Sequence, residues 1–120
     1  MSVKVYQIVL TSDEVTNINT GEYIGTPLEE KFDTRRDMMT FGEEKWDNVL
    51  FNHYTHVATI PDTDDKEEAY HAMNLWDGVL VMKHHELCTS MTAGDIIEIG
   101  GVYYMCEFIG FKEIEVIKPS

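Results

Sequence analysis

Basic residues are scarce in this 120-residue chain, which has nine Lys and Arg against 22 Asp and Glu. The formal net charge is −13, and the acids are spread over both halves of the sequence. Proteins that bind nucleic acids or anionic membranes use Lys and Arg to neutralise phosphates. We therefore expect neither as a direct partner, and we expect the folded body, not a terminal tail, to carry the charge.

Long apolar runs are absent and cysteine is rare. No run approaches the roughly 20 residues that span a bilayer, and the first four residues, MSVK, lack the apolar core of a signal peptide. Cys88 and Cys106 do not form a C-x-x-C motif. Cys106 lies in an alternating apolar stretch, which is typical of a small buried side chain. These features indicate a cytoplasmic protein.

Catalytic and phosphate-binding motifs are absent as well. The chain has no G-x-S-x-G, no G-x-x-x-x-G-K-[ST] and no G-x-G-x-x-G. Two histidine groups remain as candidates: His53 with His56, and the segment from His84 to Cys88. Residues three apart in a strand point to opposite faces, and adjacent His84 and His85 also diverge in an extended chain. We therefore expect exposed histidines and predict no catalytic residue, no metal site and no cofactor.

Five segments show strand patterns. Residues 3–10 predict a first strand near the centre of a sheet, and the alternating residues 54–60 predict a strand that Pro61 ends. Residues 95–99 and 102–109 flank Gly100 and Gly101, which is typical of a two-residue hairpin. A last strand is expected over residues 111–117. Asn17, Asn19 and Gly21 predict a loop or a short hairpin after the first strand.

Three segments show helix patterns. Thr26 and Pro27 are typical of a helix start, and Gly42 is expected to end that helix. Its predicted buried face carries Leu28, Phe32 and Met39 at helical spacing. Residues 43–51 predict a short helix, and residues 64–76 predict another that Thr63 caps. The sequence as a whole predicts one small α+β domain over residues 1–120, with an antiparallel sheet made of the N-terminal strand and a C-terminal β-meander, packed with two or three helices.

Two clusters of side chains allow more than one interpretation. Five acids concentrate in seven residues at the start of the predicted 64–76 helix: Asp62, Asp64, Asp65, Glu67 and Glu68. Carboxylates are favourable at a helix N-terminus, so this run is either a solvated helix start or a surface for a basic partner. Met38, Met39, Phe41 and Trp46 similarly belong either to the core or to an exposed contact patch.

One stretch resembles a known group of proteins. Residues 89–111 contain a Ser-Met-x-x-Gly-Asp turn, a strand, a glycine turn, a Tyr-rich strand and a Gly-Phe bend. The residues concerned are Ser90, Met91, Gly94, Asp95, Gly101, Tyr103, Tyr104, Gly110 and Phe111. This stretch resembles the C-terminal tail of small proteins of phages and mobile elements, including YodL-like domains. The resemblance covers about a fifth of the chain; it implies an accessory protein of such an element and assigns no catalytic residue.

The function that these observations favour is binding without catalysis. The hypothesis is an acidic accessory factor of a phage or mobile element that acts on a host protein with a basic surface. In its sharper form it is a DNA-mimic inhibitor, with carboxylates in place of phosphates. Two alternatives stay open: a minor structural or assembly protein of a phage that self-associates, and a small enzyme without a recognisable motif, for which the segment from His84 to Cys88 is the candidate site.

Overall fold

The structure, a computed structural model, describes residues 2–75 and 81–116. Along the chain it contains β1 (Val3–Gln7), α1 (Ser12–Thr20), α2 (Pro27–Phe41), the 3-10 helices η1 (Gly42–Lys45) and η2 (Asn48–His53), β2 (Thr55–Ile60), α3 (Lys66–Leu75), β3 (Met82–Lys83), β4 (Ile96–Ile99), β5 (Val102–Cys106) and β6 (Phe111–Ile114). The predicted α+β fold with an antiparallel sheet is confirmed. None of the described helices is both long and apolar enough to cross a membrane.

The sheet has six strands in the order β3-β2-β1-β4-β5-β6, and every neighbouring pair is antiparallel. The N-terminal strand β1 is central, as its sequence predicts. The hairpin at Gly100 and Gly101 is also confirmed, because both residues have positive φ, +58° and +87°. These are the values that a two-residue turn between β4 and β5 requires. The short edge strand β3 was not predicted from the sequence.

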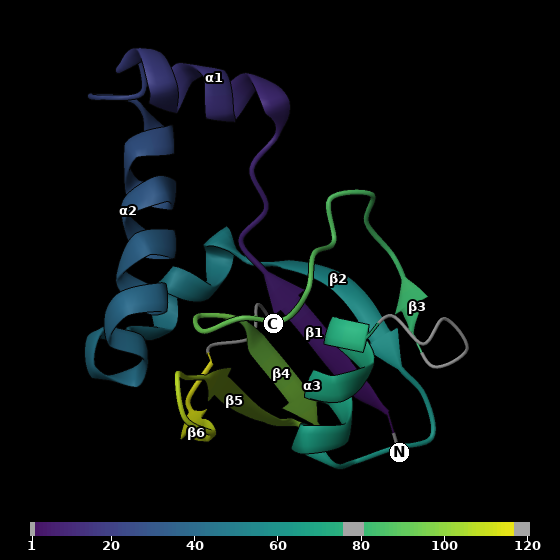
Figure 1. Cartoon of the computed structure of the whole chain (residues 1–120). Helices are drawn as coiled ribbons and strands as arrows, with labels where there is room; N and C mark the ends of the chain where they lie inside the picture. The colour runs from purple at the N-terminus through teal and green to yellow at the C-terminus, as the bar shows by residue number, and fades with distance from the viewer. Residues whose placement is uncertain (1, 76–80, 117–120) are drawn as a thin grey trace.

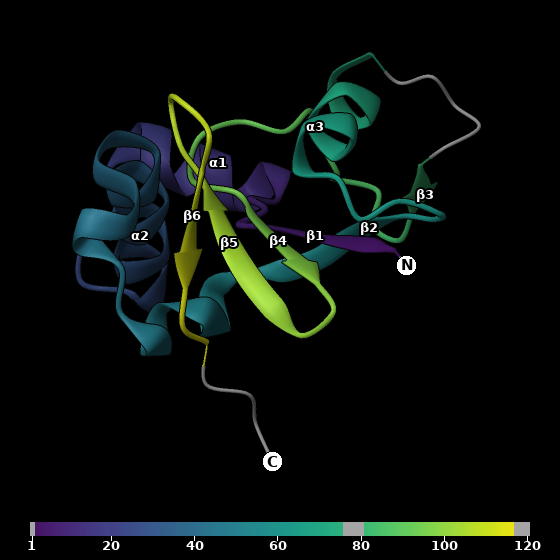
Figure 2. The same cartoon turned by 90° about the horizontal axis from the view of Figure 1, so that it is seen from below.

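Helices cover the two faces of the sheet unequally. On one face, Ala69, Ala72 and Met73 of α3 pack against buried residues of β1, β2 and β4. On the other face, Met38 of α2 packs against Ile96 and Met105, together with aromatic residues of the η1–η2 region. Figure 1 shows α3 in front of the sheet and α2 at its side, and Figure 2 shows the same arrangement from below.

The loop or hairpin predicted around residues 17–21 is wrong, because this segment is the helix α1. Thr11 and Glu14 form a capping box: the Thr11 hydroxyl accepts from the Glu14 amide at 3.2 Å, and the Glu14 carboxylate accepts from the Thr11 amide at 2.8 Å. Gly21, with φ +79°, ends the helix in the left-handed conformation. The Thr-x-x-Glu signal was present in the sequence, but the asparagines inside the helix favoured a turn.

We expect the replacement Thr11→Ala to loosen α1 without unfolding the domain. No residue of α1 is buried, so the helix depends on its cap more than on packing. The expected loss is about 1 kcal/mol of local stability, measured as faster amide hydrogen exchange in α1. Thr26→Ala is a matched control, since Thr26 also stands at a helix N-cap but makes no side-chain capping bond. If Thr11→Ala did not exchange the α1 amides faster than Thr26→Ala does, the result would contradict the prediction.

Two other predictions about helices need correction. Thr34 and Met38 are the buried residues of α2, not the face of Leu28, Phe32 and Met39, of which Met39 is 41% exposed. Met38 packs against the core cluster on this side of the sheet, so the buried side of α2 lies one residue away from the predicted stripe. The third helix begins at Lys66, and Asp65 caps it by accepting from the Glu67 and Glu68 amides. Trp76 and Ile117, predicted as ends of elements, lie outside the described residues.

Candidate functional site

A groove runs between α2 and η2 and has a volume of about 460 Å³. Its apolar floor includes Pro27, Met38 and Leu50. Four carboxylates line it: those of Glu29, Glu30, Asp33 and Asp37. We call this feature the acidic groove. Glu30, Asp33 and Asp37 are three and four residues apart, which brings them to one side of the helix. The sequence does not single out these acids because they are interleaved with Lys31, Arg35 and Arg36.

Two basic side chains neutralise the acidic groove only in part. Lys45 is among the residues that line the groove. Arg36 lies 3.3 Å from Asp33 and 3.8 Å from Asp37, and its side chain is 59% exposed. An exposed guanidinium shared by two carboxylates is weakly held, so a cation from outside can compete with it. The groove therefore offers negative charge above an apolar floor, which is the combination that suits the long side chains of Arg and Lys.

The five acids predicted as a partner surface surround the start of α3. Asp62, Asp64, Asp65, Glu67 and Glu68 are all exposed. Asp65 is engaged in capping the helix, which supports the interpretation of this run as a helix start. Within the described residues, none of the five makes an ion pair.

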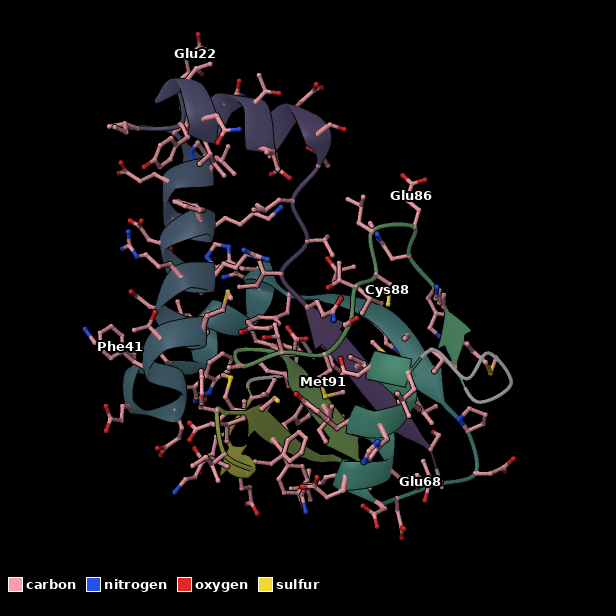
Figure 3. The ribbon with its side chains drawn as sticks, viewed as in Figure 1. Glu22, Phe41, Glu68, Glu86, Cys88 and Met91 are labelled. Atoms are coloured by element: carbon pink, nitrogen blue, oxygen red, sulfur yellow. The ribbon has the colours of Figure 1, made fainter. Side chains whose placement is uncertain are left out.

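The structure does not bring this run together with the acidic groove. The two lie on helices that pack against opposite faces of the sheet. Figure 3 shows the same dispersal, with Glu22, Glu68 and Glu86 at three separate edges of the molecule. The negative charge is therefore divided among several surfaces, and a partner that contacts one of them leaves the others free.

The predicted histidine groups are rearranged in space. His53 and His56 do not form a pair: His53 faces Glu30, whereas His56 lies beside His84, with 4.8 Å between the ring centroids. The register between β1 and β2 shifts between Val5 and Tyr6, because β2 has a bulge at Val57, which has no partner residue on β1. Consequently Val57 and Ala58 are both buried, and His56 is left opposite Tyr6 on the other face. Sequence spacing alone does not reveal the His56–His84 pair, because β3 was not predicted.

The segment from His84 to Cys88 lacks the features of an activated nucleophile. The His85 Nδ1 atom accepts from the Leu87 amide at 3.0 Å, and the Cys88 amide donates to the His85 carbonyl at 3.1 Å. The ring and the carbonyl of His85 therefore both stabilise the turn over residues 85–88. Burial raises the pKa of the Cys88 thiol, which disfavours the thiolate that nucleophilic chemistry needs. Burial likewise raises the pKa of Cys106, to about 12, in agreement with its predicted buried position.

The turn at residues 89–95 is held to the sheet by hydrogen bonds. Asp95 is buried, and its Oδ2 atom accepts from the Gln7 side chain at 2.9 Å and from the Thr92 amide at 3.0 Å. The Gln7 amide nitrogen also donates to the Thr89 carbonyl, and its oxygen accepts from the Thr89 amide. These bonds fasten residues 89–95 to the central strand. The motif therefore has a sufficient explanation in folding.

The aromatic and Met cluster is divided between core and surface. Met38 is buried and Trp46 packs against the same core cluster, with its indole donating to the Glu115 carbonyl at 2.8 Å. Met39 and Phe41 are 41% and 44% exposed. Figure 3 shows Phe41 pointing away from the sheet at the end of α2.

No protein-family model matches this chain, and neither the curated proteins nor the solved structures that were searched contain a match. No relative therefore assigns a role to any of these residues.

Proposed function

We propose that this protein is a non-enzymatic binding protein whose acidic groove takes up a basic segment of another protein. The observation that carries the proposal is the lining of the groove by Glu29, Glu30, Asp33 and Asp37 above an apolar floor. Aliphatic parts of Arg or Lys side chains would cover Pro27, Met38 and Leu50, while their charged ends meet the carboxylates.

The charge of the whole molecule supports this proposal. A net charge of −13 attracts basic proteins over a distance and raises their rate of association. Such an attraction weakens as salt rises, because ions screen exposed charges. We therefore expect fast binding that is sensitive to salt.

The proposed partner is a host protein, and the proposed context is that of a phage or mobile element. The context rests on the resemblance of residues 89–111. In the sharper form, the partner binds nucleic acid and the carboxylates occupy its phosphate-binding surface. Competition by DNA distinguishes that form from a general basic partner.

The test is an affinity capture from host lysate with three versions of the protein. The groove variant carries Glu30→Gln, Asp33→Asn and Asp37→Asn. The control variant carries Asp62→Asn, Asp64→Asn and Glu67→Gln, which removes the same charge from the other face and leaves the Asp65 cap intact. Bound proteins are eluted with rising salt and identified by mass spectrometry.

We expect the wild type and the control variant to retain the same basic protein, and the groove variant to release it at clearly lower salt. Loss in the control variant alone would place the contact at the start of α3 and refute the role of the groove. Retention of no specific protein, or only of further copies of the chain, would refute the proposed function and favour an assembly role.

A further inference from the structure

Two histidine nitrogens converge on one hydroxyl at the β2–β3 edge of the sheet. The Nε2 atoms of His56 and His84 lie 3.1 Å and 2.8 Å from the Oγ1 atom of Thr59. The ring centroids are 4.8 Å apart. His56 and Thr59 belong to β2, and His84 directly follows β3, where its amide donates to the Val57 carbonyl at 2.8 Å. The backbone of both strands thus fixes the pair.

The shared hydroxyl restricts the hydrogens on the two rings. A threonine hydroxyl donates one hydrogen bond and can accept two. At least one Nε2 atom therefore donates to the Thr59 hydroxyl, and at most one receives the Thr59 hydrogen on its lone pair. A neutral imidazole can exchange these tautomers, so each Nε2 atom can present a lone pair to the space near Thr59.

We propose that His56 and His84 form a binding site for a divalent transition-metal ion, with the Thr59 hydroxyl and water completing the coordination. Imidazole nitrogen is a common ligand of Zn²⁺, Ni²⁺ and Cu²⁺, and the general order of affinities places Cu²⁺ first. This site is independent of the acidic groove, and the proposed binding function does not require it.

The ring separation fits coordination by two imidazoles. A tetrahedral ion with metal–nitrogen distances of about 2.05 Å holds the centroids of two ligating rings about 5 Å apart. The observed 4.8 Å is close to that value. Binding therefore requires the ion to take the place between the rings that the Thr59 hydroxyl now bridges, with rotation of the side chains.

Neighbouring side chains limit the movement of the pair. Tyr6 packs against His56 with 5.2 Å between centroids and limits its rotation. Lys4 of β1 and Glu98 of β4 pair with each other at 3.7 Å and are the other charged groups that act on His56, in opposite directions.

The ion would have fewer protein ligands than a structural metal centre. Among the described residues, no group of three or more His, Cys, Asp and Glu side chains is arranged to hold a metal ion. A site with two imidazoles and open positions exchanges its metal readily. We therefore expect reversible binding that depends on both histidines.

The test is titration of the metal-free protein with CuCl₂ and with ZnCl₂ in a non-coordinating buffer, followed by calorimetry. We expect one ion per chain in the wild type. His56→Ala and His84→Ala should each lower the affinity about tenfold or more. His71→Ala is the matched control, because His71 is an exposed histidine on α3, and it should leave the affinity unchanged.

Electron paramagnetic resonance of the Cu²⁺ complex gives a second readout. We expect hyperfine splitting from two imidazole nitrogens in the wild type and from no more than one in His84→Ala, whose replaced side chain is exposed. Absence of binding by the wild type would overturn the proposal. The proposal would also be overturned if a folded variant lacking both His56 and His84 bound Cu²⁺ as tightly as the wild type.

Discussion

Replacing Gly94 with alanine is expected to destabilise the protein by about 3 kcal/mol. Gly94 has φ +96°, which costs an L-residue roughly 1–2 kcal/mol. A Cβ atom there would also lie 3.0 Å from the Met39 nitrogen and 3.1 Å from the Met38 carbonyl carbon. These are backbone atoms of α2, so they cannot move aside without shifting the helix. The loss of unfolding free energy is measured by urea denaturation.

Gly110→Ala is the matched control for Gly94→Ala. Gly110 also has positive φ, +76°, but no atom lies within 4 Å of the position of its Cβ. Its replacement should cost only the backbone strain, about 1 kcal/mol. The difference between the two variants measures the close approach of α2 to residues 89–95. If the two variants lost equal stability, the close contact between Gly94 and the backbone of α2 would be contradicted.

Gly94 also takes part in hydrogen bonds that connect separate elements. The Tyr54 hydroxyl donates to the Gly94 carbonyl, and the Gly94 amide donates to the Cys106 carbonyl at 2.8 Å. The same turn therefore links α2, the start of β2 and the end of β5. Because α2 forms one wall of the acidic groove, a shift of α2 in Gly94→Ala should also weaken binding to a basic partner.

The second large effect expected is a dependence of stability on pH that originates at Asp95. Burial raises the pKa of Asp95 to about 7, although the Thr92 amide, the Gln7 side chain and Arg35 act in the opposite direction. Between the ordinary pKa of an aspartate and pH 7, the native protein therefore holds a proton that the unfolded chain releases. Stability must then fall as pH rises through this window, by up to about 1.4 kcal/mol per pH unit.

Asp95→Asn should remove this contribution. Asparagine stays neutral, and its side-chain oxygen can still accept from Gln7 and Thr92. Relative to the wild type, the variant should gain about 4 kcal/mol as the pH is raised from 4 to 8. Other acids and the net charge also respond to pH, but they are common to both proteins, so the difference isolates Asp95. A difference that does not change with pH would contradict the raised pKa. Urea denaturation at several pH values measures it.

Three acidic features of this chain have different explanations. The run at the start of α3 contains the cap residue Asp65, and the buried Asp95 ties a turn to β1. Only the carboxylates along α2 line a groove with an apolar floor. The proposed binding surface is therefore not the one that the sequence favours, and the matched charge variants decide between the two.

The sequence by itself determined the main elements of this protein. Local signals sufficed for the strand β1, the start of α2 at Pro27 and the hairpin at Gly100 and Gly101. Proline, glycine and alternating β-branched residues act on the backbone within a few residues. The capping box at Thr11 shows that α1 was predictable as well, if the cap is given more weight than the asparagines.

Only the tertiary structure decided which side chains meet. The His56–His84 pair depends on a bulge in β2 and on the pairing of β3, and neither is a local property. The acidic groove depends on how α2 lies against η2, and the raised pKa of Asp95 depends on burial under residues distant in sequence. Strand register and burial arise from contacts between residues far apart in the chain, and for this reason the candidate sites could not be located from sequence spacing.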